Sequence, residues 1–81
     1  NCDSIVQMVI EDSRERKHDW LANNSIEQIY KRKILSINDD EVECNGVALI
    51  SNTSKLKIKY GMYLDELKAR ILYYQSIPDL L

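Results

Sequence analysis

The 81-residue sequence lacks any apolar stretch of the roughly 18 to 20 residues that a membrane-spanning helix needs. Its single histidine and two cysteines are too few, and too far apart along the chain, to form a closed zinc site. No signal peptide or transit segment is visible. We therefore expect an intracellular protein in which the thiols of Cys2 and Cys44 are reduced, with no bound metal or cofactor.

Strong charge of either sign is also missing, since the formal net charge is -2 at pH 7. Such a balance gives no overall attraction to nucleic acid, so any binding to phosphates would have to be local. The hydrophobic content of 44% and charged content of 30% are typical of one small globular domain spanning residues 1–81. Because the chain begins with Asn1 rather than Met, we expect it to be a piece of a larger protein domain.

The hydrophobic pattern of the first half predicts an alternation of strands and helices. Ser4 to Glu11 holds a short continuous apolar run that fits a strand covered on both faces or the start of a helix, and we favour the strand. A short helix is predicted over Arg16 to Asn23. A long strand over Ile26 to Ile37 follows, with its turn at Asn38 to Asp40.

The strongest local signal is the dipeptide Asn45-Gly46, which suits the two positive-φ positions of a type I′ hairpin turn. With that turn, Cys44 would face Val47 and Val42 would face Leu49, all on one side of the sheet. Turn chemistry and hydrophobic pattern therefore agree on a hairpin here.

The last third alternates and then changes period. Lys55 to Tyr60 predicts a strand whose lysines point outwards, either along a phosphate backbone or as protection of a solvated edge. Met62 to Gln75 has apolar residues at helical spacing and predicts a helix. Pro78 cannot continue that helix, and Leu80-Leu81 resembles the start of another strand. The predicted order is approximately βαβββα, an α/β fold.

A mixed acidic and basic cluster, Asp12-Ser13-Arg14-Glu15-Arg16, follows the first predicted strand. Nucleases keep metal-binding carboxylates at such a position, although any strand also ends in polar residues. With the elements downstream, the chain resembles the nuclease domain of the XPF-type structure-specific endonucleases, which include the archaeal Hef nuclease and vertebrate FANCM. The residues that carry the resemblance are Val9 to Glu15 for the strand running into D-S-R-E, Asp39 to Glu41 for a Gly-Asp-Tyr hairpin, Val47 to Asn52 for the returning strand and Gly61 to Ile71 for a Gly-led helix.

The resemblance implies a small restriction-endonuclease-like mixed sheet with a C-terminal helix. In active members, acidic residues hold a divalent metal and a lysine helps to position the attacking water. Asp12 and Asp40 match acidic positions here, whereas Ile50 and Asn52 stand where Glu and Lys are expected. We therefore expect a catalytically inactive domain in which these four residues are the remains of a metal site.

Members of this family work as heterodimers in which one subunit can lack catalytic residues. By resemblance, the domain would bind branched or structured DNA and an XPF/ERCC-type partner subunit in the nucleus, in DNA recombination or repair, including meiotic crossover. The candidate DNA contacts are Arg14, Arg16, Lys17, Lys31, Arg32, Lys33, Lys55, Lys57 and Lys59, although residue by residue each cluster favours a solvated surface.

Two other functions remain open. Val42 to Val47 looks like the V-x-V-N-G turn of the S4 RNA-binding domain, although the apolar run from Ile5 to Ile10 has no place in that domain. The acidic balance also allows a protein-protein interaction module that binds no nucleic acid, for which Tyr63 and Tyr73 are candidate contacts.

Overall fold

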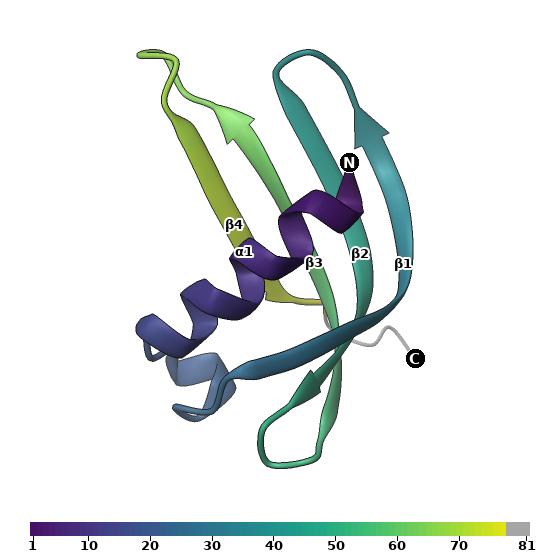
Figure 1. Ribbon diagram of the computed structural model, residues 1–81, viewed down its shortest axis with the longest axis vertical. Helices are drawn as coiled ribbons and strands as arrows, with labels where there is room; N and C mark the ends of the chain where they lie inside the picture. Colours follow the sequence, from purple (N-terminus) through teal and green to yellow (C-terminus); the bar gives the residue numbers. More distant parts are fainter. Residues whose placement is uncertain (78–81) are drawn as a thin grey trace.

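The computed structural model describes residues 1–77 and shows one α-helix packed on a four-stranded antiparallel sheet (Figure 1). The strands follow one another in the sheet in chain order, each antiparallel to the next. The elements are helix α1 (Cys2–Glu15), the short 3-10 helix η1 (Asp19–Leu21), and strands β1 (Ile26–Ile37), β2 (Glu41–Ile50), β3 (Lys55–Leu64) and β4 (Arg70–Ser76).

The apolar run near the start is a helix, so the strand predicted over Ser4 to Glu11 is wrong. Its buried side chains recur every three or four residues and together face the sheet; they are Cys2, Ile5, Val6, Val9, Ile10 and Ser13. The Asn1 side chain accepts the backbone N–H of Ser4 and so caps the helix. The exposed Gln7 and Met8 lie on the outer face of the helix. The apolar run is too short for this helical period to be distinguished from a buried strand in the sequence.

Ser13 joins the end of this helix to the start of the sheet. Its side chain is 0% exposed, and its hydroxyl donates to the Ile10 carbonyl oxygen at 2.8 Å. The Ser13 hydroxyl oxygen in turn accepts the backbone N–H of Ile26, the first residue of β1, at 2.9 Å. The serine of the D-S-R-E cluster therefore satisfies a buried strand amide.

Two predicted strands and one predicted turn are confirmed. β1 has the predicted bounds, and the chain bends at Asn38 to Asp40 before β2. The strand predicted from Lys55 to Tyr60 is present and continues to Leu64, with Ile58 and Tyr60 buried. The helix predicted over Arg16 to Asn23 is reduced to η1.

The hairpin predicted at Asn45-Gly46 is wrong, because both residues lie inside β2 and Gly46 has no positive φ. A Cβ on Gly46 would lie 2.8 Å from both Ile29 Cγ2 and the Tyr30 carbonyl oxygen. The register of β1 against β2 shifts just beyond Tyr30, and Lys31 there has a φ of 52°. Glycine at this position allows the bulged part of β1 to lie close to the β2 backbone. Gly46 is therefore needed for strand packing and not for a turn.

The helix predicted over Met62 to Gln75 is also wrong, because this segment forms the end of β3, a turn and β4. The Asp65 carboxylate accepts the backbone N–H groups of Leu67 and Ala69 at 2.8 and 2.9 Å, which folds the chain into a turn instead of capping a helix. Leu80-Leu81, where a further strand start was expected, lies outside the described residues. The order is therefore α followed by four strands, in place of βαβββα.

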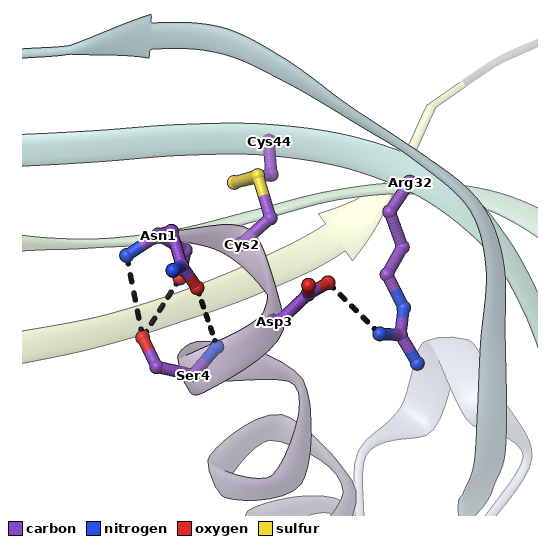
Figure 2. The surroundings of a disulfide bond; sticks show 6 residues. All are labelled: Asn1, Cys2, Asp3, Ser4, Arg32 and Cys44. Carbon is purple, nitrogen blue, oxygen red and sulfur yellow. Dashed lines mark hydrogen bonds and ion pairs between the residues drawn. A yellow bond between two sulfur atoms is a disulfide. The ribbon is translucent and has the colours of Figure 1, made fainter.

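Cys2 and Cys44 form a disulfide, so the expectation of reduced thiols is wrong (Figure 2). The two residues are 42 positions apart in sequence, but the start of α1 rests on the middle of β2 and brings their Cα atoms to 6.0 Å. Both cysteines are buried in the core between helix and sheet. The bond therefore fixes where the helix begins relative to the sheet.

We expect Ser13→Ala to lower the free energy of unfolding by about 1 to 3 kcal/mol, because it leaves the buried amide of Ile26 without a hydrogen-bond partner. Urea denaturation followed by circular dichroism measures this change. Ser76→Ala, at an exposed position near the end of β4, is the matched control and should change stability little. A loss at Ser13 no larger than at Ser76 would contradict the assignment of this serine.

Reduction of the disulfide should lower the free energy of unfolding by roughly 4 kcal/mol, the value for freeing a closed loop of this length in the unfolded chain. Small domains have about 5 to 15 kcal/mol in total, so the reduced protein should be close to unfolding. Urea denaturation with and without dithiothreitol measures the difference, and the variant Cys2→Ser/Cys44→Ser should behave like the reduced protein. Equal midpoints in the two conditions would refute a stabilising bond.

Candidate interaction surface

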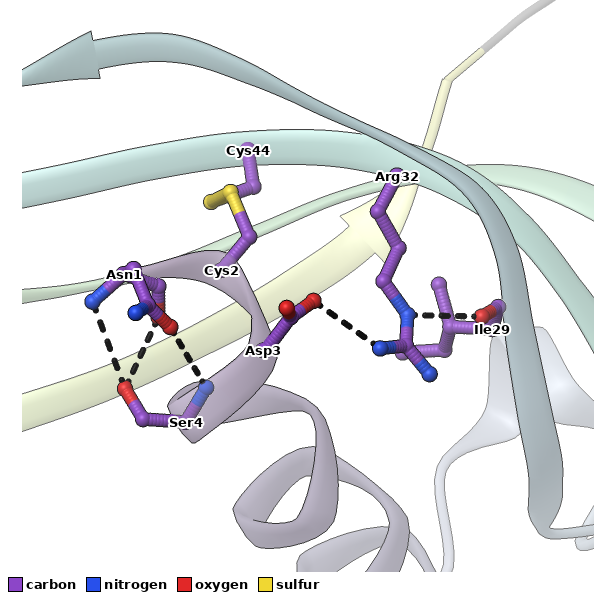
Figure 3. A network of polar contacts seen from close by, with 7 residues as sticks. All are labelled: Asn1, Cys2, Asp3, Ser4, Ile29, Arg32 and Cys44. Atoms are coloured by element: carbon purple, nitrogen blue, oxygen red, sulfur yellow. Dashed lines mark hydrogen bonds and ion pairs between the residues drawn. A yellow bond between two sulfur atoms is a disulfide. The ribbon is translucent and has the colours of Figure 1, made fainter.

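The first turn of α1 is fastened to the sheet by covalent and polar bonds. Besides the disulfide at Cys2, the Asp3 carboxylate accepts from Arg32 Nη1 at 2.9 Å (Figure 3). Arg32 Nε also donates to the Ile29 carbonyl oxygen at 2.9 Å, so one guanidinium connects the helix to both sides of the bulge in β1. These contacts hold the helix end beside the bend of β1.

β1 continues past this helix end, and its last residues lack a cover. Figure 1 shows the arrowhead of β1 and the β1–β2 turn reaching beyond the N-terminus of α1. Ile34 is paired with Cys44, beside the fixed end of the helix, and Ile37 is paired with Val42, nearer the end of the sheet that the helix leaves open. Ile34, Leu35 and Ile37 are 51%, 46% and 57% exposed, and we call these three residues the β1 strip.

The β1 strip also lies on an open edge of the sheet. β1 is the first strand of the order β1-β2-β3-β4, so on its outer side it has no neighbouring strand among residues 1–77. Alternate backbone N–H and C=O groups of an edge strand point away from the sheet and can pair with another strand. The surface therefore combines exposed apolar side chains with unpaired backbone groups.

Opposite charges flank the β1 strip along the chain. Lys31 and Lys33 precede it, and Asp39 and Asp40 follow it in the β1–β2 turn. Within the described part of the chain, none of these four side chains is in an ion pair. The charges are therefore available to a partner.

A pocket of about 240 Å³ adjoins this end of the sheet. Its lining mixes the β1–β2 turn, the first turns of α1 and the facing ends of β3 and β4; the apolar members are Ile5, Val42, Met62 and Leu64, and the charged ones include Asp39, Asp40, Glu41 and Arg70. Pockets for small ligands usually have about 300 Å³ or more, so this one suits a single side chain better than a whole ligand.

A second polar cluster lies at the other end of α1. Tyr74 Oη donates to Asp12 Oδ2 at 2.7 Å, and His18 Nε2 lies 2.7 Å from the same phenol oxygen. Because the phenol proton points to Asp12, His18 Nε2–H is the donor to Tyr74. Trp20 packs edge-on against Tyr74, and Arg16 forms an ion pair with Asp12 at 3.2 Å. The cluster joins α1, η1 and β4.

The contacts of this cluster connect three elements of the fold, and the pKa of its phenol does not favour a nucleophile. Burial raises the pKa of the Tyr74 phenol, and the hydrogen bond to the neighbouring Asp12 carboxylate raises it further. A phenol with a raised pKa stays protonated and is a poor nucleophile. Tyr73 lies on the opposite face of the sheet from α1. Its burial, and to a smaller extent the negative charges of Glu43 and Glu41, raise its pKa to about 12.

The structure separates the residues matched to a nuclease site. Asp12 is in α1, Asp40 is in the β1–β2 turn, and Ile50 and Asn52 lie at the far end of β2 and in the turn after it. Asp40 precedes β2 and Ile50 ends it, so the length of this ten-residue strand, about 30 Å at the usual rise, separates them. Within residues 1–77, no group of three or more His, Cys, Asp or Glu side chains could hold a metal ion.

The nine basic candidates lie in three separate places. The groups are Arg14, Arg16 and Lys17 at the end of α1 and beyond it, Lys31, Arg32 and Lys33 at the bend of β1, and Lys55, Lys57 and Lys59 along β3. Several of these charges are neutralised within the domain: Arg16 by Asp12, Arg32 by Asp3, and Lys59 by Glu43 at 2.7 Å. DNA binding by these residues stays a prediction.

Two features of the structure were not predicted from the sequence: the uncovered β1 strip and the contact between His18 and Tyr74. The β1 strip was placed on the correct strand, but only the sheet order reveals an uncovered edge strand. Tyr74 was assigned to a helix and His18 gave no signal, so their contact across 56 residues was not visible in the sequence. The alternation of apolar and polar residues could not distinguish an inner strand from an edge.

Comparisons with known proteins give no match: no family model, no curated protein and no solved structure corresponds to this chain. Among the described residues, no helix is long and apolar enough to cross a membrane. Only the geometry of the domain therefore bears on its function.

The raised tyrosine pKa values predict a loss of stability in alkaline solution. The folded domain keeps the Tyr73 and Tyr74 protons to a higher pH than the unfolded chain, whose phenols titrate near 10.0. Their contribution is therefore complete below pH 10 and decreases as the pH rises towards about 12. Urea denaturation between pH 8 and about 11.5 measures the decline.

Tyr73→Phe and Tyr74→Phe should each make this decline shallower. Tyr63→Phe, at a half-exposed position beside Tyr73, is the matched control. A decline that is identical in all three variants and the native chain would contradict the assignment.

Proposed function

We propose that this domain is a protein-interaction module that binds an extended apolar segment along the β1 strip. The bound segment would add a strand to the sheet, with main-chain hydrogen bonds giving affinity and side-chain contacts giving selectivity. The observation that carries the proposal is the exposure of Ile34, Leu35 and Ile37 on an edge strand that has no outer neighbour within residues 1–77.

A single exposed apolar side chain needs no explanation, because most of a protein surface is apolar. Three within four residues on an open strand edge are a different case, because such an edge promotes association with other chains. Natural sheets protect their edges with lysines and bulges. The middle of β1 has both, at Lys31 to Lys33, whereas the β1 strip has a register shift between Ile34 and Ser36 but lacks charged residues.

The disulfide bears on where such a module would act. Disulfides persist in oxidising compartments and are rare where glutathione keeps thiols reduced. An intracellular protein was expected together with reduced thiols at Cys2 and Cys44, and in the structure these two cysteines form a disulfide. An oxidising compartment therefore forms part of this proposal.

The XPF-like function stays a prediction, including branched-DNA binding with an XPF/ERCC-type partner in the nucleus and the restriction-endonuclease-like topology. Its pattern matches now have less support, because the run before D-S-R-E is helix α1 and the segment from Gly61 to Ile71 is strand and turn. The S4-like alternative loses its turn in the same way, since Asn45-Gly46 lies inside β2. The interaction module is the one early hypothesis that depends on none of these matches.

Selection from a displayed peptide library on the immobilised, oxidised domain tests the proposal. We expect apolar peptides to be enriched and to bind Ile37→Asp at least about tenfold more weakly, since burying one isoleucine is worth about 1.5 to 3 kcal/mol. Leu67→Asp is the matched control, because Leu67 is 89% exposed in the β3–β4 turn, away from the β1 strip. The control should keep the native affinity.

Two outcomes would overturn the proposal. One is enrichment of peptides that bind Ile37→Asp as tightly as the native domain. The other is an absence of any bound peptide or protein combined with salt-dependent binding of branched DNA that weakens in Arg14→Ala/Arg16→Ala, which would favour the nucleic-acid function.

A further inference from the structure

We propose that the occupant of the β1 strip is a second copy of this chain, paired antiparallel along the two β1 edges. This inference rests on the proposed function and names the partner of the same site. The two four-stranded sheets would join into one continuous sheet about a twofold axis near Leu35 and Ser36. The surface must then be complementary to itself, and three features meet that requirement.

The first feature is the charge order along the edge. Residues 31–40 read Lys-Arg-Lys-Ile-Leu-Ser-Ile-Asn-Asp-Asp, with basic residues at one end, acidic residues at the other and apolar residues between them. In an antiparallel pair, the basic end of each copy lies beside the acidic end of the other. If Ile34 faces Ile37 of the second copy, Lys31 lies beside Asp40 and Arg32 beside Asp39, twice per dimer. A parallel pair would instead place like charges together.

The second feature is where the apolar side chains lie. Ile34 and Ile37 are paired with Cys44 and Val42, whose side chains belong to or pack against the core beneath α1. A twofold axis perpendicular to the sheet leaves both helices on the same side. The exposed isoleucines of the two copies would then form one apolar patch flanked by the two disulfide-fixed helix ends.

The third feature is that the charged groups, apart from Arg32 with its ion pair to Asp3, have no ion-pair partner in their own chain within residues 1–77. The Asn38 side chain holds the β1–β2 turn by accepting the backbone N–H groups of Asp40 and Glu41 at 2.9 Å. The Asp39 and Asp40 carboxylates are therefore not needed for the turn. Lys31, Lys33 and both aspartates lack ion pairs with other residues in the described range.

Sedimentation equilibrium of charge-exchanged variants tests this pairing. We expect the native, oxidised chain to change from the 9.5 kDa monomer to twice that mass as its concentration rises. Lys31→Glu and Asp40→Lys should each stay monomeric over the same range, because like charges then meet at both ends. An equal mixture of the two variants should restore the double mass, since opposite charges meet again at both ends.

The matched control is Lys17→Glu, which makes the same change in charge as Lys31→Glu at an exposed position outside β1. It should dimerise as the native chain does, and circular dichroism should show that every variant is folded. Ile37→Asp should also be monomeric. The inference is overturned if the native chain stays monomeric at all concentrations, or if the two charge variants dimerise separately as well as they do together.

Failure of this inference can be separated from failure of the proposed function. A monomeric native chain that still binds selected peptides through Ile37 refutes the second copy and leaves the interaction module in place. A monomeric chain that binds no peptide refutes both.

Discussion

The disulfide between Cys2 and Cys44 is the constraint on which the rest of this small domain depends. It fixes the first turn of α1 to the middle of β2, and the Asp3 to Arg32 ion pair fixes the same turn to the bend of β1. From that point the helix covers the part of the sheet that holds Ile58, Tyr60 and Ala48. The end of the sheet beyond the fixed turn remains uncovered, and the β1 strip lies there.

The other end of the helix is held by polar contacts instead of a covalent bond. Ser13 reaches into the core and binds the first amide of β1, while Asp12 accepts from Tyr74 and pairs with Arg16. The D-S-R-E cluster therefore has a structural explanation within this fold, as the joint between α1, β1 and β4. Asp12 and Arg16 form an ion pair with each other, which leaves less charge for an external ligand.

The sequence predicts correctly those elements whose local pattern fits only one type of secondary structure. The alternation of Lys55 to Tyr60 and the polar turn after Ile37 correspond to observed structure. The failures occur where a short pattern fits two structures. The run from Ile5 to Ile10 fits a strand or a helix, and the buried face of α1 requires a sheet to pack against before the helical period becomes decisive.

Tertiary contacts also overrode strong local signals. Asn45-Gly46 has the chemistry of a tight turn, yet the close approach of Ile29 and Tyr30 assigns Gly46 to a strand interior. Gly61 is similar: a Cβ there would lie 2.6 Å from the Tyr73 hydroxyl, so this glycine makes room for an aromatic side chain on β4. Two further features follow only from the fold: the disulfide between the two cysteines and the position of β1 at the edge of the sheet. No local sequence pattern predicts either of them.

The central claim is that the fixed helix end leaves the last part of β1 as an uncovered, unpaired edge. Amide hydrogen exchange of the dilute, oxidised domain tests it most directly, residue by residue, over 32–37. The account predicts that the outward-pointing amides of this segment exchange far faster than those of β2, which has a strand on each side, and that they slow as the concentration is raised. Equal protection of the two strands at high dilution would contradict it.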